Sequence, residues 1–244
     1  MANFAFMSGT GNDFLVGTYE GPVSEIQIIA LVSDAEYEVD GVIFVEPINE
    51  EIVKMHYFNN DGSSAELCVN GVRCVAKYSV DNNYVDSNKF IVSAPVSDID
   101  VLVQDNSVEI QAPLPTYSQE TVLFDQYEGI KSEVGNPHFL VPVDDVVNTN
   151  LVKLKKLIDA LDLFEDGFNL EIYQIIDEKY IKARVFERGV GETDACGSGA
   201  LCLFNYLYKT KQIENDSYIL FPGGDLNLKF LEDKLILSGE VIYL

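Results

Sequence analysis

The sequence predicts an α+β protein built from two similar halves. Short runs of β-branched and aromatic residues alternate with turn residues, a pattern typical of strands. Fewer segments have the apolar spacing of amphipathic helices. Two short motifs recur in the same order at nearly the same distance along the chain, which indicates an internal duplication.

The elements expected from these patterns fall on both sides of a proline-rich boundary. The predicted strands are residues 41–46, 89–93, 107–111, 180–186 and 218–221, and the predicted helices are residues 70–80, 151–161 and 197–209. Residues 112–116 contain two prolines, which cannot continue a sheet ladder. We therefore expect an N-terminal half of residues 1–112, joined by a C-terminal strand at 236–244, and a C-terminal half of residues 113–235.

Bulk composition excludes several classes of partner. The chain has 244 residues, of which 47% are hydrophobic, so it can bury a sizeable core. Its net charge of −24 repels polyanions, so we expect neither a nucleic-acid partner nor binding to anionic membranes. The first residues lack the basic and apolar segments of a signal peptide, and no apolar run reaches the ~20 residues that span a bilayer. These features favour a cytoplasmic protein.

The duplicated motifs contain the residues of greatest chemical interest. Gly11-Asn12 is repeated as Gly135-Asn136, 124 residues later. The pattern C-x-x-G-x-x-C occurs at residues 68–74 and again at residues 196–202, 128 residues later. Either match alone could arise by chance, but both together, in one order and at nearly one offset, indicate duplication.

Each cysteine motif begins directly before a predicted helix, which places Cys68 and Cys196 at helix N-termini. The partial positive charge there favours a thiolate and lowers the thiol pKa, and the free N–H groups can hold a carboxylate. If the halves pack about a pseudo-twofold axis, one thiolate can remove a Cα proton while the opposing thiol protonates the other face. The motifs therefore predict an amino-acid racemase or epimerase with two cysteines.

Other uses of the cysteines explain the pattern less well. A zinc site needs ligand pairs at short spacing or nearby histidines, and the chain has only His56 and His138. A cysteine hydrolase could use His138, but the second matched cysteine would then have no role. Cys74 and Cys202 fall on another helix face, so we expect them to be buried as small hydrophobic residues. We expect no metal and no cofactor.

Five segments carry a resemblance to a known family: residues 9–14, 58–63, 68–74, 135–138 and 187–200. Through them the chain resembles the diaminopimelate epimerases over nearly its whole length. The resemblance implies two pseudo-symmetric α+β halves, each a sheet wrapped around a central helix, with a cleft that closes on the substrate. It also implies the interconversion of LL- and meso-diaminopimelate, on the route to lysine, without pyridoxal phosphate or metal.

The resemblance also implies roles for individual residues, with Cys68 and Cys196 as the acid/base pair. The carboxylate of the reacting centre would lie beside Asn12 and bind backbone N–H groups around Val69, Asn70, Gly71, Gly197 and Ser198. The distal amino and carboxylate groups would be bound by Asn59, Asn136, Asn169, Glu187 and Arg188, with His138 supporting Asn136.

Simpler interpretations of these residues stay open. Asn12 and Asn136 each follow a glycine and can be turn formers, and Glu187 and Arg188 can form a surface ion pair. Asn169 is supported only by its place in the family.

Departures from the family pattern leave the substrate open. Val69 stands where the family usually has glycine, Phe139 where cysteine is common, and residues 6–8 read Phe-Met-Ser in place of Lys-Met-His. The chain is also shorter than typical relatives, which predicts trimmed loops in the cleft. A racemase of another amino acid, such as histidine or diaminobutyrate, is the alternative, and a catalytically silent binding module is a third. The partner expected is a small amino acid, and a homodimer stays open.

Overall fold

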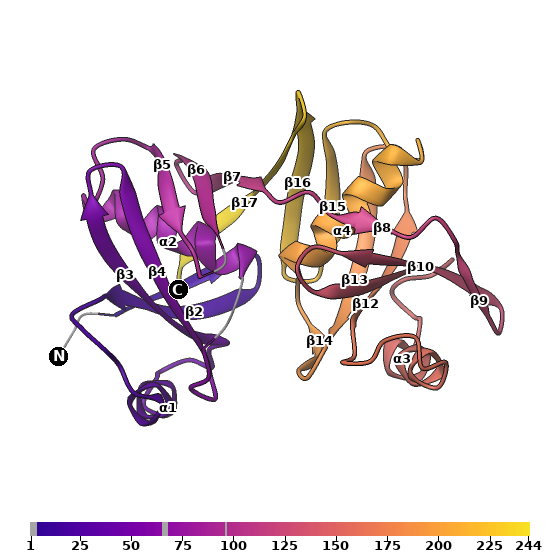
Figure 1. The fold of residues 1–244 in the computed structure, drawn as a ribbon, viewed down its shortest axis with the longest axis horizontal. Helices are drawn as coiled ribbons and strands as arrows, with labels where there is room; N and C mark the ends of the chain where they lie inside the picture. The colour runs from indigo at the N-terminus through magenta and orange to yellow at the C-terminus, as the bar shows by residue number, and fades with distance from the viewer. Residues whose placement is uncertain (1–3, 65–67, 96) are drawn as a thin grey trace. The chain divides into compact units, whose positions relative to one another are not determined.

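The computed structural model describes residues 4–64, 68–95 and 97–244. The chain divides into two compact units (Figure 1). Unit 1 comprises Met1–Gln111 and Ser238–Leu244, and unit 2 comprises Ala112–Leu237. Within the described ranges, no helix is long and apolar enough to cross a membrane.

Unit 1 is a closed sheet with one helix inside it and one outside. Its strands are β1 (Ala5–Gly9), β2 (Asn12–Thr18), β3 (Gly41–Asn49), β4 (Ile52–Asn59), β5 (Lys89–Ser93), β6 (Asp98–Gln104), β7 (Ser107–Ala112) and the end of β17 (Lys234–Tyr243). Each strand from β1 to β7 pairs with the next, and β17 pairs with both β7 and β1. These described strands therefore form a sheet that closes on itself.

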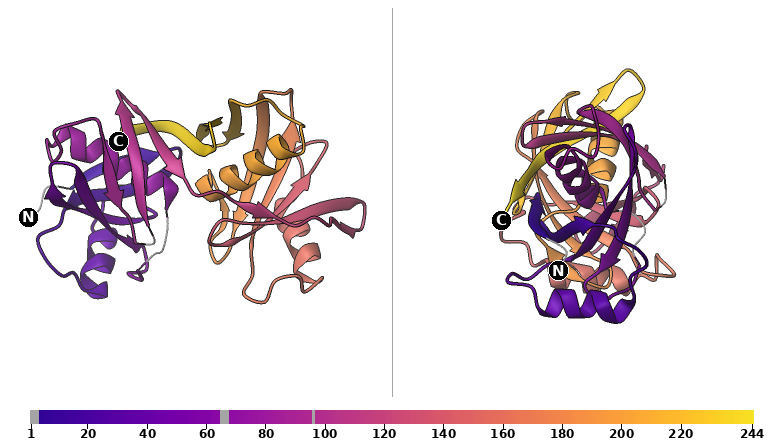
Figure 2. Two further views of the ribbon diagram at one scale, coloured as in Figure 1. Left: turned by 45° about the horizontal axis from the view of Figure 1, so that its top comes forward. Right: turned by 90° about the vertical axis from the view of Figure 1, so that its left-hand side faces the viewer.

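Helix α2 (Val69–Asp81) lies within this ring of strands and packs against β1 to β6 (Figures 1 and 2). Every residue from Val69 to Ala76 is buried, which is the state expected of a helix enclosed on all sides. The expectation of a sheet wrapped around a central helix is confirmed in this unit.

Helix α1 (Glu25–Ser33) packs outside the ring, against β3, and was not expected from the sequence. It begins with a capping box, in which Gln27 accepts a hydrogen bond from the backbone N–H of Ser24. Only Ile28 is buried, whereas Ile26 is 80% exposed. The apolar residues therefore do not form the single stripe by which an amphipathic helix is recognised.

Unit 2 is a sheet with a helix on each face. Its strands are β8 (Thr116–Tyr117), β9 (Val122–Phe124), β10 (Tyr127–Glu133), β11 (Pro137–Pro142), β12 (Asn169–Ile175), β13 (Tyr180–Glu187), β14 (Gly191–Thr193), β15 (Ser217–Phe221) and β16 (Gly224–Leu231). The strands β10, β11, β12, β13, β15 and β16 pair in that order. Helix α4 (Gly197–Lys209) packs against β8, β11, β12, β15 and β16.

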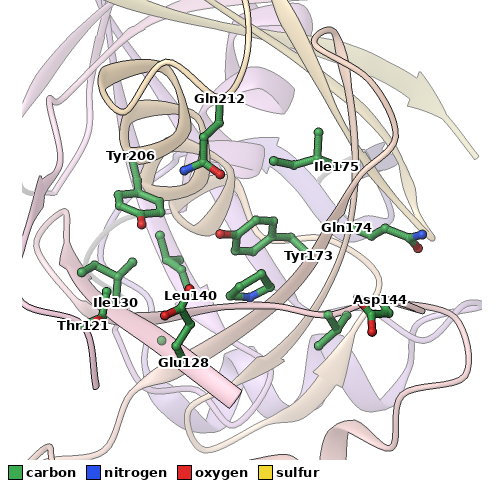
Figure 3. Close-up of a pocket in the computed structure, with 13 residues that line it drawn as sticks. Thr121, Glu128, Ile130, Leu140, Asp144, Tyr173, Gln174, Ile175, Tyr206 and Gln212 are labelled. Atoms are coloured by element: carbon green, nitrogen blue, oxygen red, sulfur yellow. The ribbon is translucent and has the colours of Figure 1, made fainter. Parts of the chain in front are cut away.

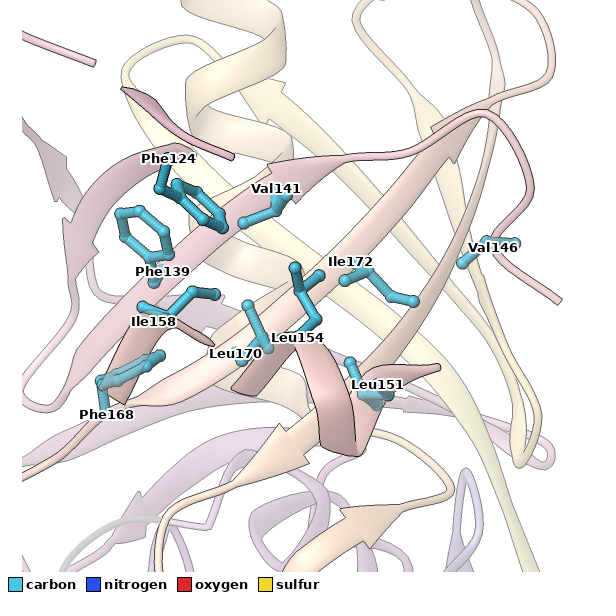
Figure 4. Close-up of a cluster of buried hydrophobic side chains, with 10 residues drawn as sticks. All are labelled: Phe124, Phe139, Val141, Val146, Leu151, Leu154, Ile158, Phe168, Leu170 and Ile172. Carbon is cyan, nitrogen blue, oxygen red and sulfur yellow. The ribbon is translucent and has the colours of Figure 1, made fainter. Parts of the chain in front are cut away.

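Helix α3 (Leu151–Asp159) covers the other side of this sheet (Figure 4). Its Leu151, Leu154 and Ile158 are buried against apolar side chains of β11 and β12. Phe139 is fully buried in this cluster and packs against neighbouring aromatic rings. This departure from the family pattern therefore affects the core beneath α3.

The two units repeat the same strand register. Phe14 of β2 lies opposite Gly41 of β3. His138 of β11, 124 residues after Phe14, lies in the same way opposite Asn169 of β12, 128 residues after Gly41. Both pairs of strands are parallel, and both enclosed cysteine helices contain 13 residues. The duplication indicated by two short motifs thus extends through the sheet of each unit.

Candidate active site

Each matched cysteine is the N-cap residue of its helix. Cys68 has φ −123° and ψ 101° before α2, and Cys196 has φ −136° and ψ 112° before α4. The Sγ of Cys68 accepts a hydrogen bond from the N–H of Gly71 at 3.3 Å, and the Sγ of Cys196 from that of Gly199 at 3.4 Å. Both sulfur atoms therefore lie at helix N-termini, as the motifs predict.

The residues after each cysteine supply the first N–H groups of the helix. Val69 and Asn70 begin α2, and Gly197 and Ser198 begin α4. Such N–H groups have no carbonyl partner within the helix and carry its positive end, so they suit a carboxylate. Val69 is only 4% exposed, and the Oγ of Ser198 lies 3.3 Å from the Sγ of Cys196.

In unit 1 a buried arginine holds the amide side chains at the start of α2. Asn70 donates to the Oδ1 of Asn12 and accepts at 2.7 Å from Arg73, which also donates to the hydroxyl of Thr10 at 2.9 Å. Burial lowers the pKa of the fully buried Arg73 to about 10, so it still carries its charge at neutral pH. This network fixes the direction of both asparagines.

Arg73 was missed in the sequence analysis, although a signal existed. It stands inside an otherwise small and apolar C-x-x-G-x-x-C motif, and the equivalent position of the second motif is Leu201. Only the fold reveals that two of its partners come from opposite ends of the chain: Thr10, in the turn after β1, and the backbone carbonyl of Glu240 in β17, at 3.2 Å.

Asn59 lies at the same end of the unit 1 sheet. It ends β4 opposite Gly41, and its side-chain amide donates to the hydroxyl of Ser63 at 2.9 Å. Asp40, which precedes Gly41, accepts from the side chain of Asn12 at 3.2 Å. Unit 1 therefore brings Asn12, Asn59, Asn70 and Cys68 to one end of its closed sheet.

Unit 2 places a buried polar pair under its cysteine helix. His138 and Glu171 are both fully buried, and the ring Nδ1 lies 2.8 Å from the Oε1 of Glu171. The other ring nitrogen lies 3.1 Å from the Oδ1 of Asn136, so His138 holds the predicted substrate-binding asparagine. A Cβ on Gly199 would lie 2.4 Å from the Oε1 of Glu171, so only glycine fits there.

Glu171 was also missed in the sequence analysis. The sequence does contain a sign of it, because Glu171 is an acidic residue among the mostly apolar residues 169–173, which begin the buried strand β12. Its Oε2 has no hydrogen-bond partner among the described atoms. A buried carboxylate beside a helix start acts on nearby titrating groups through its charge.

Three of the five residues expected to bind the distal end of the substrate lie together around the end of β13. The side-chain oxygen of Asn169 accepts from the backbone N–H of Arg188 at 2.8 Å. The side chain of Glu187 accepts a hydrogen bond from the hydroxyl of Thr193 at 2.5 Å. Arg188 is exposed, and its guanidinium group donates a hydrogen bond to the backbone carbonyl of Asp166. Glu187 occupies the position in unit 2 that Asn59 occupies in unit 1, 128 residues earlier.

The pKa of Cys196 corrects one expectation. Burial and the charges of Glu187 and Glu171 raise the pKa of Cys196 well above its ordinary value, although the hydroxyl of Ser198 and the N–H of Gly199 oppose this. The expected lowering by the helix N-terminus is wrong for this cysteine, because desolvation outweighs the helix dipole. At neutral pH Cys196 is a thiol and can donate a proton.

The second cysteines of the motifs are buried, as predicted. Cys74 and Cys202 are both fully buried, and burial raises the pKa of Cys74 to about 12. They behave as small hydrophobic residues within the two helices.

The role of Glu171 can be tested with Glu171→Gln, which keeps an oxygen for His138 and nearly the same volume. Because one negative charge near the thiol is lost, we expect the pKa of Cys196 to fall. Alkylation of the Cys196 peptide by iodoacetamide, followed by mass spectrometry, should then begin at lower pH. In a plot of turnover rate against pH, the fall on the alkaline side should likewise move to lower pH.

Glu165→Gln is the matched control, since Glu165 is an exposed acid of the same unit. It should leave the alkylation profile unchanged. A folded Glu171→Gln protein with the original profile would show that this carboxylate does not act on Cys196.

Comparison with known proteins supports a family assignment by sequence. The model of the family described as diaminopimelate epimerase matches residues 4–113 and 131–243. The diaminopimelate epimerase of Brachyspira hyodysenteriae is 29% identical over 272 residues, covering 99% of this chain and 96% of that protein. That of Bacillus cereus strain ATCC 14579 is 31% identical over 278 residues, with the same two coverages.

Solved structures share the fold at much lower identity. A phenazine biosynthesis protein of the PhzF family from Bacillus anthracis has a TM-score of 0.75 at 13% identity, covering 99% of this chain and 96% of that one. A hydroxyproline epimerase from Agrobacterium vitis has a TM-score of 0.74 at 10% identity, with coverages of 99% and 90%. The sequence matches decide the family: this chain belongs to the diaminopimelate epimerase family, and it is an isomerase of the class that works without pyridoxal phosphate.

Proposed function

We propose that this protein is a diaminopimelate epimerase that interconverts LL- and meso-diaminopimelate. The observation that carries the proposal is the matched pair of cysteines, each an N-cap residue of an enclosed helix in one of two units with the same register. A reaction that runs alike in both directions suits two matched halves. Catalysis would use these two cysteines as its only proton carriers.

In the proposed mechanism the α-carboxylate binds to the N–H groups at the start of α2 and α4. These donors stabilise the negative charge that develops next to the carboxylate when Cα loses its proton. Cys68, as a thiolate, takes the proton from one face of Cα, and the Cys196 thiol gives a proton to the other face. The step leaves Cys68 as the thiol and Cys196 as the thiolate, ready for the reverse reaction.

The raised pKa of Cys196 supports this assignment of the first step. Cys196 keeps its proton at neutral pH because burial disfavours its charged form, so it enters this step as the proton donor. Turnover of the opposite epimer would begin with Cys196 as the thiolate and Cys68 as the thiol.

The distal residues favour a substrate with a second amino-acid group. The guanidinium of Arg188 suits a carboxylate, and the carboxylate of Glu187 suits an ammonium group. Asn169 holds the backbone of Arg188, and His138 holds Asn136. Diaminopimelate carries an ammonium and a carboxylate at its far end, whereas most other amino acids do not.

A racemase of another amino acid, such as histidine or diaminobutyrate, is the second candidate. The substitution of Val69 beside the first cysteine favours it, because a side chain now lies where the family usually has none. Proteins of this fold act on other substrates, as the names of a hydroxyproline epimerase and a probable proline racemase indicate for those proteins.

The test is Cα hydrogen exchange in deuterated water with the reduced protein. Separate reactions would contain LL-diaminopimelate, histidine, diaminobutyrate, lysine or glutamate, and mass spectrometry would follow deuterium at Cα. Exchange confined to diaminopimelate is the expected result. Preferred exchange into another amino acid would keep the two-thiol mechanism and replace the substrate, and no exchange into any of them would overturn the mechanism.

Arg188→Ala should separate the distal site from the reacting centre. We expect kcat/KM for diaminopimelate to fall by about 10- to 100-fold, because a charge-assisted hydrogen bond contributes about 1.5–3 kcal/mol. The value of kcat at saturating diaminopimelate should change much less, because Arg188 is proposed to bind the distal end of the substrate and not the reacting Cα. A loss in kcat as large as the loss in kcat/KM would mean that Arg188 does not act by binding the distal carboxylate.

A further inference from the structure

Unit 2 contains a cavity of about 450 Å³ at the far end of α4 from Cys196 (Figure 3). Tyr206, which lines it, follows Cys196 by ten residues, or about 15 Å along the helix. None of the residues predicted to bind the substrate lines this cavity. Its volume lies in the range of small-molecule sites, roughly 300–1,000 Å³.

The cavity is lined by a tyrosine hydroxyl that has no partner within the protein. Tyr173 is 3% exposed, and its hydroxyl makes no hydrogen bond with any residue that the structure describes. Its hydroxyl is drawn toward the open space between Tyr206 and Gln212 (Figure 3). Because this hydroxyl faces the cavity and has no partner within the protein, it can form a hydrogen bond with a ligand atom.

The charged groups of the lining are all acidic. Glu128 and Asp144 are the ionisable acids among the described lining residues, and no lysine or arginine accompanies them. Burial, followed by the charges of Tyr206 and Glu128, raises the pKa of Tyr173, so its hydroxyl stays neutral. The rest of the lining is mixed: neutral polar side chains such as Gln174 lie beside apolar ones that include Ile130 and Leu140.

The same position is filled in unit 1. Tyr78 and Tyr84 stand 128 residues before Tyr206 and Gln212. In unit 1 the ring of Tyr84 packs edge-on against Tyr78, with ring centres 5.9 Å apart, and its hydroxyl lies 2.6 Å from that of Thr18. In unit 2 the smaller Gln212 turns to Thr210, with its amide donating at 2.8 Å, so no ring fills the space.

We propose that this cavity of unit 2 is a binding site for a small aliphatic primary amine. The ammonium group would lie near Glu128 and donate to the hydroxyl of Tyr173, with the ring faces of the tyrosines adding cation–π attraction. The alkyl chain would pack against Ile130 and Leu140. The strongly negative chain would raise the local concentration of such a cation and repel anions. This site is separate from the proposed function.

The test is calorimetric titration of the whole protein with 1-aminopentane and 1,5-diaminopentane at constant ionic strength. We expect saturable binding of one amine per chain, and no binding of 1-pentanol or pentanoate. Potassium chloride at equal ionic strength should not displace the amine. Displacement by potassium, or binding of the alcohol with similar affinity, would overturn the proposal.

Gln212→Tyr is the decisive variant, because it restores the ring found in unit 1 at an exposed position. It should raise the dissociation constant at least tenfold while turnover of the enzyme stays normal. Glu128→Gln should weaken binding in the same direction, and Glu178→Gln, an exposed acid elsewhere in unit 2, should not. Unchanged affinity in both Gln212→Tyr and Glu128→Gln would place the amine elsewhere and refute the assignment.

Discussion

Replacing either Cys68 or Cys196 by alanine should lower the rate of epimerisation by about 1,000-fold or more. General acid–base catalysis by one group contributes about 100- to 10,000-fold, and inversion at Cα needs both groups in every turnover. Chiral chromatography of LL- and meso-diaminopimelate would measure the loss. Both variants should fold, because alanine is small and the N-cap hydrogen bonds that the sulfur atoms accept, at 3.3 and 3.4 Å, are weak.

The chain offers a matched control for this experiment. Cys202→Ala removes a fully buried thiol from the same helix that Cys196 begins, so it tests the loss of a sulfur atom without the loss of the N-cap. We expect it to retain most of its turnover. If either N-cap variant turned over at a near-normal rate, the two-cysteine mechanism would be wrong.

Deuterium exchange adds a signature that a merely structural role would not produce. A variant with one remaining thiolate can still remove the Cα proton from the face that it reaches. We expect slow exchange without inversion, from one epimer in Cys68→Ala and from the other in Cys196→Ala. A variant damaged only in its fold would lose exchange from both epimers equally.

The parts of the fold that could be predicted from the sequence are those governed by local patterns and repetition. The helix at 197–209 has the predicted bounds, and the strand at 89–93 does as well. Both cysteines lie at helix N-termini because small and turn-forming residues follow each of them in the chain. These features depend on neighbours within a few residues, which sequence patterns describe directly.

The parts that could not be predicted depend on contacts between distant segments. Arg73 bonds Thr10 and the carbonyl of Glu240, and Glu171 bonds His138 across the pair of β11 and β12. The spacing of these residues along the chain does not indicate that they are neighbours. They come together only because the strands that carry them pair in the folded sheets. The pKa of Cys196 was misjudged for the same reason: it is raised first by burial within the folded unit and then by Glu187 and Glu171, which come from the end of β13 and from β12.

Oxidation should inactivate the enzyme by joining Cys68 to Cys196. Two sulfur atoms that serve opposite faces of one Cα must be able to approach closely when the substrate is absent, and a disulfide forms where the two Cα atoms come within about 4.4–6.8 Å. Treatment with a mild oxidant such as diamide should abolish turnover, and dithiothreitol should restore it. Peptide mapping under non-reducing conditions would identify the crosslink.

The pH dependence of this inactivation distinguishes it from other thiol chemistry. A thiolate is the attacking species, and the raised pKa of Cys196 keeps that thiol protonated at neutral pH. Crosslinking should therefore become faster as the pH rises through the range in which Cys196 loses its proton. Glu171→Gln, which lowers that pKa, should move the acceleration to lower pH.

Two controls test whether the inactivation comes from a disulfide between Cys68 and Cys196. Saturating diaminopimelate should protect the enzyme, because a bound Cα would separate the two sulfur atoms. Cys74 and Cys202 should stay reduced throughout, because both are fully buried. Inactivation that dithiothreitol cannot reverse would show that the loss does not come from a disulfide. Full activity after oxidation would mean that the two cysteines never meet at one substrate.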